Sequence, residues 1–423
     1  MSIKTKKAKY VIFGAALGLV FIALWACPGT TTEYVTTSAW KDIGEDPPLD
    51  QSVGGLDDKS SYAGDEEAMA MRYRYRYGSW EITESQGGSK VYYSKTISPQ
   101  ALAKVYEALG SPVPQSAIDA EKVAVKLNMG ENVSVNRFYI DPALIGDFVK
   151  SLKGTPVDST TFYDIQLNLG NALIGMPPGL VAKTRGEKSL YEAVAAANGF
   201  TVANMGKAVH ILNDGYTGIT DADDVKIPIS NSKYGLTHAL LGKGINDYDW
   251  IVSIAHFKGH GDAGFGGTFK NLAIGIASYY GKKDIHQNGG AEEWFFTTTF
   301  EPFQEKIVEY NQALMQNSRF KDKLVYINVL NNLSRQCDCL GDAAPAPELR
   351  DIGILASADP VALEKASVDL IYKLADDPNE TVADRLGAAH LVRTFEAHRG
   401  NHQIRHAVRL GLGNPFYELV DVQ

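Results

Sequence analysis

Cysteine is scarce in this sequence, since the 423 residues contain Cys27, Cys337, Cys339 and no others. If Cys27 belongs to an N-terminal signal, two thiols remain for the folded part, and no C-x-x-C-x-x-C run is present. Two thiolates cannot by themselves hold a cluster that needs four. The sequence therefore argues against a four-iron cluster as a cofactor.

Two phosphate-binding fingerprints are also absent. The glycines at residues 264–267 are not followed by Gly-Lys-Ser/Thr, and the segment GFGGTFKN lacks the G-x-G-x-x-G spacing. This excludes the phosphate loop and the dinucleotide-binding turn at that position. A formal net charge of -9 argues against a general nucleic-acid-binding protein, so no nucleic-acid partner is expected.

The composition is that of an ordinary globular protein, with 44% hydrophobic and 22% charged residues. A chain of this length can bury a large core in one large domain, with or without a division into two lobes. Strand-like and helix-like segments alternate, which predicts an α/β fold with helices covering a mainly parallel sheet. We expect strands at 122–127, 250–254, 324–329 and 352–356, and helices at 99–109, 142–152, 188–197 and 360–374.

Residues 1–27 have the features of a secretion signal. Lysines at positions 4, 6, 7 and 9 precede an apolar run over residues 10–26, which is short of the roughly 20 residues of a spanning helix. The run ends in Leu-Trp-Ala-Cys, which resembles a bacterial lipobox with Cys27 as the lipidated residue. An uncleaved N-terminal helix is the alternative. Either anchor predicts a membrane-attached, extracytoplasmic protein, because the lysines mark the side retained inside.

Residues 28–64 are rich in Thr, Ser, Gly, Pro and Asp and lack a sustained apolar period, which predicts a flexible tether. We place the α/β domain at residues 65–423. Near its start, residues 69–77 alternate Met or Tyr with other residues, and Arg72, Arg74 and Arg76 fall on the opposite face of a strand. This strip is interpreted either as an edge strand kept soluble by its arginines or as a docking strip for a partner, anionic lipid or glycan.

The most informative stretch is residues 247–278. A buried strand starting at Trp250 passes through His256, Lys258 and His260, enters a glycine-rich turn at residues 264–267 and continues into a helix. Ligands of open parallel sheets bind beyond the carboxyl ends of the strands, so two imidazoles and an ammonium are well placed there. The glycines let the backbone approach a ligand, and the helix N-terminus offers amides to an anion. Each histidine taken alone is also compatible with a structural role.

Cys337 and Cys339 follow the strand expected at 324–329. Residues i and i+2 of an extended segment point the same way, so the two thiolates could clamp a transition metal such as zinc or iron. A strained disulfide and two unremarkable thiols are the alternatives. His286 follows the central helix and could return to the same sheet edge. His398, His402 and His406 are interpreted as structural or surface residues, because Gly400-Asn401 interrupts the helix that would align them.

From about residue 89 to its end, the chain resembles domain-of-unknown-function family 362, whose members are often labelled uncharacterised iron–sulfur-centre proteins. The similar segments include VAVKLNMGE (123–131), AHFKGHGDAGFGGTFKNLAIGIAS (255–278), CDC (337–339) and DIGILASADPVALEKASVDLIY (351–372). The clustered-cysteine insertion of many relatives is absent, which argues against iron–sulfur electron transfer. The resemblance implies a site made of His256, Lys258, His260, Gly266, Gly267, Lys270, Asn271, His286, Cys337 and Cys339.

Two main hypotheses follow. In the first, a metal-dependent site uses Lys258, His256 and His260 for catalysis on a small anionic ligand. Its metal ligands are Cys337, Cys339, His256, His260 and His286, and its ligand-binding residues are Gly264, Gly266, Gly267, Lys270 and Asn271. In the second, the protein binds a metal or a small anion without turnover. A structural surface protein that assembles through the strip at 69–77 is a third possibility.

Overall fold

A computed structural model describes residues 82–129, 139–159, 188–213, 223–230, 232–286, 300–336 and 346–423. The signal-like segment, the tether, the Arg/Tyr strip and the two cysteines Cys337 and Cys339 lie outside these residues, as do the expected boundaries at 27 and 64. No helix within the described ranges is long and apolar enough to cross a membrane.

An eight-stranded sheet lies at the centre of the fold, in the order β12-β1-β11-β10-β7-β2-β3-β4. Neighbouring strands are parallel except at β11, which runs antiparallel to both β1 and β10. The prediction of an α/β fold with a mainly parallel sheet is therefore confirmed. The strands are β1 (Glu84–Ser94), β2 (Val123–Lys126), β3 (Thr155–Asp158), β4 (His210–Ile211), β7 (Trp250–His256), β10 (Leu324–Leu330), β11 (Gly353–Ser357) and β12 (Tyr417–Asp421).

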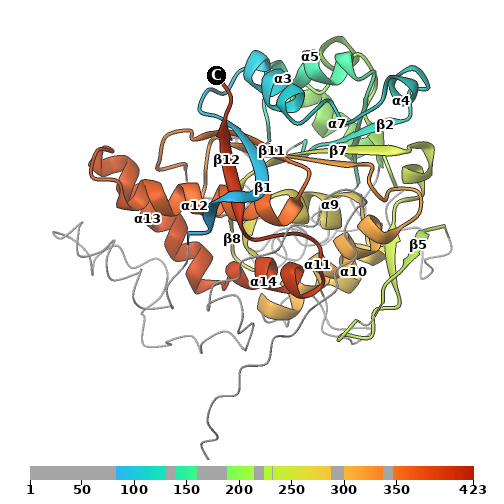
Figure 1. The fold of residues 1–423 in the computed structure, drawn as a ribbon. Helices are drawn as coiled ribbons and strands as arrows, with labels where there is room; N and C mark the ends of the chain where they lie inside the picture. The colour runs from blue at the N-terminus through green and yellow to red at the C-terminus, as the bar shows by residue number, and fades with distance from the viewer. Residues whose placement is uncertain are drawn as a thin grey trace, which may run out of the picture. The chain divides into compact units, whose positions relative to one another are not determined.

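Helices cover both faces of this sheet (Figure 1). Successive side chains of a strand point to opposite faces, and in β7 Ile251 joins one hydrophobic core while Val252 and Ile254 join the other. One core is covered by α3 (Pro99–Ala108), α4 (Gln115–Asp119), α5 (Pro142–Ser151), α7 (Lys188–Ala197) and α8 (Val202–Met205). The other is covered by α9 (Thr268–Ile276), α10 (Tyr279–His286), α11 (Phe300–Gln316), α12 (Pro360–Asp376), α13 (Val382–Ala397) and α14 (Asn401–Arg409).

The helix starts follow from local capping chemistry. The Asp359 carboxylate accepts hydrogen bonds from the amides of Val361 (2.9 Å) and Ala362 (3.0 Å), with Pro360 at the start of α12. Ser98 and Asp141 cap α3 and α5 in the same way. The helices predicted at 99–109, 142–152 and 188–197 are confirmed, with ends that differ by no more than one residue.

Two small hairpins stand beside the main sheet. One pairs β5 (Val225–Pro228) with β6 (His238–Leu241) and is followed by the 3-10 helix η2 (Lys243–Asp247). The other pairs β8 (Lys258–His260) with β9 (Gly264–Gly266). The predicted glycine-rich turn at 264–267 is therefore wrong for its first three residues, which form a strand. Gly264 has φ +76 and a Cβ there would lie 2.3 Å from Gly400 Cα, so glycine is required by close backbone packing.

The order of the strands reverses between β2 and β7. The chain passes from β2 outward to β3 and β4, then returns to β7 on the other side of β2 and continues to β10. Lys126 at the end of β2 is in register with Ser253 of β7. The carboxyl ends of these two strands therefore mark the topological switch point, where open α/β sheets receive their ligands.

Candidate functional site

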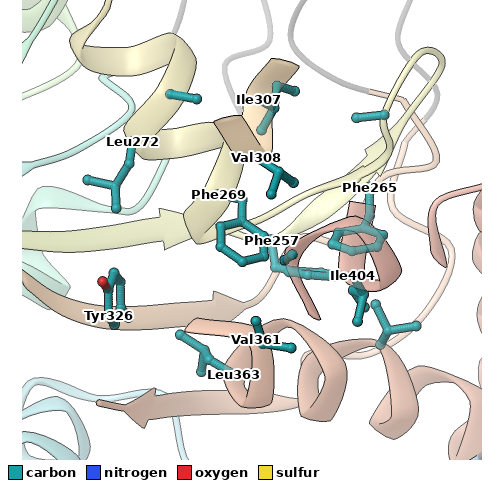
Figure 2. Packing of buried hydrophobic residues seen from close by; sticks show 14 of the residues in the cluster. Phe257, Phe265, Phe269, Leu272, Ile307, Val308, Tyr326, Val361, Leu363 and Ile404 are labelled. Atoms are coloured by element: carbon teal, nitrogen blue, oxygen red, sulfur yellow. The ribbon is translucent and has the colours of Figure 1, made fainter. Parts of the chain in front are cut away.

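The histidine and lysine side chains of the central stretch are buried, not displayed on the surface. His256 ends β7, and Lys258 and His260 lie on β8; each is no more than 4% exposed. Phe257, between His256 and Lys258, points into the core, where its ring stacks on Phe265 at 5.4 Å (Figure 2). This aromatic contact anchors the segment, because a buried aromatic pair adds packing energy to its area burial.

His256 is oriented by the neighbouring strand. Its Nε2 donates a hydrogen bond of 2.6 Å to the carbonyl of Asn331, directly after β10. A carbonyl only accepts, so in the neutral ring the proton is on Nε2 and the basic nitrogen is Nδ1. A histidine held in this way by a backbone carbonyl has the tautomer and orientation of a typical metal ligand.

His260 has the opposite arrangement. Its Nδ1 accepts hydrogen bonds from the amides of Asp262 (3.0 Å) and Ala263 (3.1 Å), so the neutral ring carries its proton on Nε2. The imidazole thus closes the turn between β8 and β9, and it stacks on Phe303 at 5.9 Å. Because its basic nitrogen is occupied by backbone amides, the observed geometry supports a structural role for His260.

His286 reaches the same region from α10. Its Nδ1 donates to the carbonyl of Lys282 at 2.6 Å, and its ring lies 4.8 Å from that of Phe303, the ring that also contacts His260. Burial lowers the pKa of His286 to about 4, so the ring is neutral at physiological pH. The rings of His286 and His260 therefore both contact the ring of Phe303.

The N-terminus of α9 faces a carboxylate of the protein itself. The Phe269 amide donates to Glu364 of α12 at 2.8 Å, and Asn328 donates to the other carboxylate oxygen at 3.2 Å. A Cβ at Gly267 would lie 2.1 Å from that oxygen, so the glycine makes room for Glu364. Burial raises the pKa of Glu364 to about 7. The amide that the sequence analysis offered to an anionic ligand thus already has an acceptor.

Asn271, in the first turns of α9, lies over the switch point. Its side-chain amide donates to the Lys126 carbonyl at 3.2 Å and to the Ser253 hydroxyl at 2.9 Å, and its oxygen accepts from Lys126 Nζ at 3.0 Å. One side chain therefore joins the end of β2 to the middle of β7. Asn271 was predicted as a ligand-binding residue, and the structure places it where a ligand of this fold is expected.

Lysine side chains gather beside Asn271. Lys126 forms an ion pair with Asp158 at 3.0 Å, and both groups come from carboxyl ends of parallel strands. Lys282 of α10 is 2% exposed and donates to the Ser159 hydroxyl and to the Ala277 carbonyl, the latter at 2.9 Å. Burial lowers the pKa of Lys282 to about 7, and the nearby cations Lys126 and Lys270 act in the same direction.

Sequence analysis missed Lys126 and Lys282. One signal was available, because Lys126 ends an otherwise apolar strand and strand ends carry function in this class of fold. No comparable signal marked Lys282, which has the sequence context of an exposed lysine in a polar helix.

Cys337 and Cys339 lie outside the described residues, but the chain that leads to them can be followed. The Gly259 amide donates to the Ser334 carbonyl at 2.8 Å, and a Cβ at Gly261 would lie 3.3 Å from the side chain of Gln336. The segment before Cys337 thus runs along the hairpin that carries His260. Within the described ranges, no group of three or more His, Cys, Asp or Glu side chains is arranged to hold a metal.

The C-terminal histidines belong to another part of the molecule. The helix does break between His398, which follows α13, and His402, on α14, as predicted. His402 Nε2 bonds Glu305 of α11 at 2.9 Å, and His406 Nδ1 lies 3.9 Å from the same carboxylate. The Glu305 carboxylate also accepts from the Tyr234 hydroxyl at 2.5 Å. These contacts tie α14 to α11 and support the structural interpretation.

Comparison with known proteins identifies the family of the chain. The family model described as Domain of unknown function (DUF362) matches residues 123–369, a region that contains β2, the β7–α9 segment, α10 and most of α12. No curated protein matches the chain significantly. Because the family model covers more than half of the 423 residues, the chain belongs to the DUF362 family.

Proposed function

We propose that this protein binds a small anionic ligand at the carboxyl edge of β2 and β7. The observation that carries the proposal is the side chain of Asn271, which joins Lys126 of β2 to Ser253 of β7 at the switch point of the sheet. Ligands of open α/β folds bind at such a point. Lys270 of α9 adds a cationic side chain next to it, and Lys282 of α10 adds a buried amine.

The charge of these side chains favours an anion. Lys126, Lys270 and Lys282 are near enough for the first two to lower the pKa of the third. Gathering cations in a partly desolvated place is unfavourable, and a carboxylate or phosphate oxygen among them offsets that repulsion with charge-assisted hydrogen bonds. The lysine side chains are therefore better candidates for binding the anion than the Phe269 amide, because that amide already donates to Glu364.

Replacing Lys270 by alanine is expected to weaken binding of the anion. Losing one charge-assisted contact corresponds to roughly tenfold in Kd, and wild-type affinity should fall as salt is raised. Isothermal titration with inorganic phosphate and with pyruvate measures both effects. Lys270 is chosen because it is less buried than Lys126 and Lys282, so its removal disturbs the core least.

Lys321→Ala is the matched control for this experiment. It removes the same charge from an exposed residue just before β10, at the opposite edge of the sheet. Its Kd values for both anions should equal those of wild type. Equal weakening by the two substitutions would mean that only the net charge matters, and absence of saturable binding by wild type would rule out the proposal.

A more specific proposal is that the protein also catalyses a reaction of the bound anion. His256 and Lys258 lie on the strand and hairpin next to the switch point, and both stay candidates for a catalytic role. Lys258→Ala distinguishes an enzyme from a protein that only binds the anion. An enzyme should lose turnover in this variant, whereas a binding protein shows no turnover with or without the substitution. The observed hydrogen bonds of His260 make it the weakest of the predicted catalytic residues.

A transition metal such as zinc or iron is a second candidate ligand. His256 and His286 each donate one ring N–H to a backbone carbonyl, which suits a metal ligand, whereas the tautomer of His260 does not. The route of the chain past Gly261 to Cys337 favours the two cysteines as partners of these histidines. When bound, such a metal would polarise a carbonyl or lower the pKa of a water molecule.

The metal proposal is tested by elemental analysis of protein purified without oxygen. Wild type should contain about one equivalent of zinc or iron, and Cys337→Ser/Cys339→Ser should contain almost none, because structural thiolates dominate the affinity. The metal proposal is wrong if wild-type protein contains no metal and mass spectrometry shows a Cys337–Cys339 disulfide. That result would not affect the proposed anion site.

Attachment to a membrane outside the cytoplasm is part of the same proposal. It is supported by the lysines at positions 4–9, the apolar run at 10–26 and Cys27. In a bacterial host, Cys27→Ser should move the protein out of the membrane fraction and abolish incorporation of labelled palmitate. An unchanged membrane fraction would favour the uncleaved N-terminal helix instead.

A further inference from the structure

The Lys282 amine has an unusual set of partners. It is 2% exposed, and its Nζ contacts two acceptors, the Ser159 hydroxyl and the Ala277 carbonyl. The Ser159 hydroxyl donates its own proton to the Gly275 carbonyl at 2.9 Å, so it accepts from Lys282. No third acceptor for Lys282 is found among the described residues.

This count fits a neutral amine. An ammonium has three N–H donors, and leaving one unpaired in a buried place costs about 1–3 kcal/mol. A neutral amine has two N–H donors, which match the two acceptors, and one lone pair. Burial and the like charges of Lys126 and Lys270 favour the neutral form, whereas the carboxylates of Asp158 and Asp224 oppose it. The assignment of a neutral amine therefore rests on the two acceptors of Nζ. The lone pair makes the neutral amine the nucleophilic form.

Lys126, the neighbouring lysine, has the hydrogen-bond acceptors that a charged amine needs. Lys126 Nζ contacts Asp158, Asn271 and the Leu127 carbonyl, which accounts for three donors. The contacts of Lys126 thus suit a cation, and those of Lys282 beside it suit a neutral amine. A fixed cation next to a neutral amine is the pairing that enzymes use to activate a lysine for attack on a carbonyl group.

We infer that Lys282 forms an imine with the carbonyl carbon of a small oxo acid whose carboxylate occupies the proposed anion site. The inference rests on the proposed function and names its substrate class. The lone pair of Nζ adds to the carbonyl carbon, and the amine gives up both of its protons as the carbonyl oxygen leaves as water. The Ser159 hydroxyl contacts Nζ and is placed to pass these protons.

The test is reductive trapping on the full-length protein. Pyruvate and 2-oxoglutarate are added with sodium cyanoborohydride, and the adduct is located by peptide mass spectrometry. Wild type should gain one reduced acid on the peptide that contains Lys282. Lys282→Arg keeps a long basic side chain but lacks the amine that forms the imine, so specific labelling should fall by about tenfold or more. Lys283→Arg, the adjacent matched control, should label as wild type does.

The outcomes separate the inference from the proposed function. Adduct mapped to Lys282 in wild type supports the imine even if Lys282→Arg folds poorly, because the mapping needs no variant. If pyruvate binds by titration but labelling is spread evenly over surface lysines or absent, the imine is wrong and the anion site stands. If pyruvate and phosphate neither bind nor label, both proposals are wrong.

Discussion

Replacing Gly267 by alanine is expected to destabilise the protein by about 3 kcal/mol or more, since overpacking costs up to that amount and a buried hydrogen bond is lost with it. A Cβ at this position would lie 2.1 Å from one carboxylate oxygen of Glu364 and 2.7 Å from the other. To make room, the carboxylate must leave the Phe269 amide, to which it is bonded at 2.8 Å. Urea-induced unfolding measures the free-energy change.

Gly266→Ala is the matched control in the same segment. There the added methyl group would meet only Lys270 Cδ, at 3.2 Å, and that atom belongs to a flexible side chain that can move. A loss of well under 1 kcal/mol is expected, because such contacts relax with little strain. If the two substitutions destabilise the protein equally, the close approach of Glu364 to Gly267 does not govern stability.

The second large effect concerns the charge of Glu364. Burial raises its pKa to about 7 in the folded protein, whereas the ordinary pKa of a glutamate in an unfolded chain is 4.5. Between these values the folded state binds more protons than the unfolded state, so this group makes stability fall as pH rises from about 4.5 to 7. Above pH 7 the Glu364 carboxyl is ionised in the folded protein, and the unfavourable free energy of burying that charge then lowers stability by its full amount.

Glu364→Gln removes this pH dependence. The amide is neutral at every pH and can still accept from Phe269, while Asn328 can turn its side-chain oxygen, which lacks a hydrogen-bond partner, toward the new amide. The stability of the variant relative to wild type should therefore rise by about 2–3 kcal/mol between pH 5 and pH 8. Unfolding free energies at several pH values measure this difference.

Glu364→Ala provides the contrast. It removes the acceptor of the Phe269 amide and leaves the cavity of a buried side chain, so it should destabilise the protein at every pH by roughly 2–4 kcal/mol. A stability difference between Glu364→Gln and wild type that stays constant with pH would show that the carboxylate is not neutral in the folded protein at pH 5.

Much of the fold could be predicted from local sequence patterns. The β-branched run of β7, the Asp359-Pro360 start of α12 and the glycine at the break between α13 and α14 act over a few residues, and all three were interpreted correctly. The glycines at 264–266 were wrongly assigned to a turn, because a glycine indicates that the backbone packs closely against another group but does not identify that group. Here Gly264 approaches the backbone at Gly400, and residues 264–266 form a strand.

The candidate site was predicted only in part. Asn271 and Lys270 were proposed as ligand-binding residues because they follow a conspicuous motif, and Asn271 contacts β2 and β7 beside the switch point. Glu364 was missed because a glutamate within a long amphipathic helix has the pattern of an exposed residue. It becomes buried because α12 packs against α9, whose Phe269 amide lies 95 residues away in sequence.

The sequence by itself determined the class of fold and indicated the segment of the candidate site, because strand and helix periods, caps and strand-end polar residues are local properties. Tertiary structure decided which polar side chains meet. The contact of Lys282 with Ser159 joins residues 123 positions apart, and that of Lys126 with Asn271 joins residues 145 apart. Whether a lysine is a solvated cation or a buried neutral amine depends on such contacts, because desolvation and neighbouring charges set its pKa.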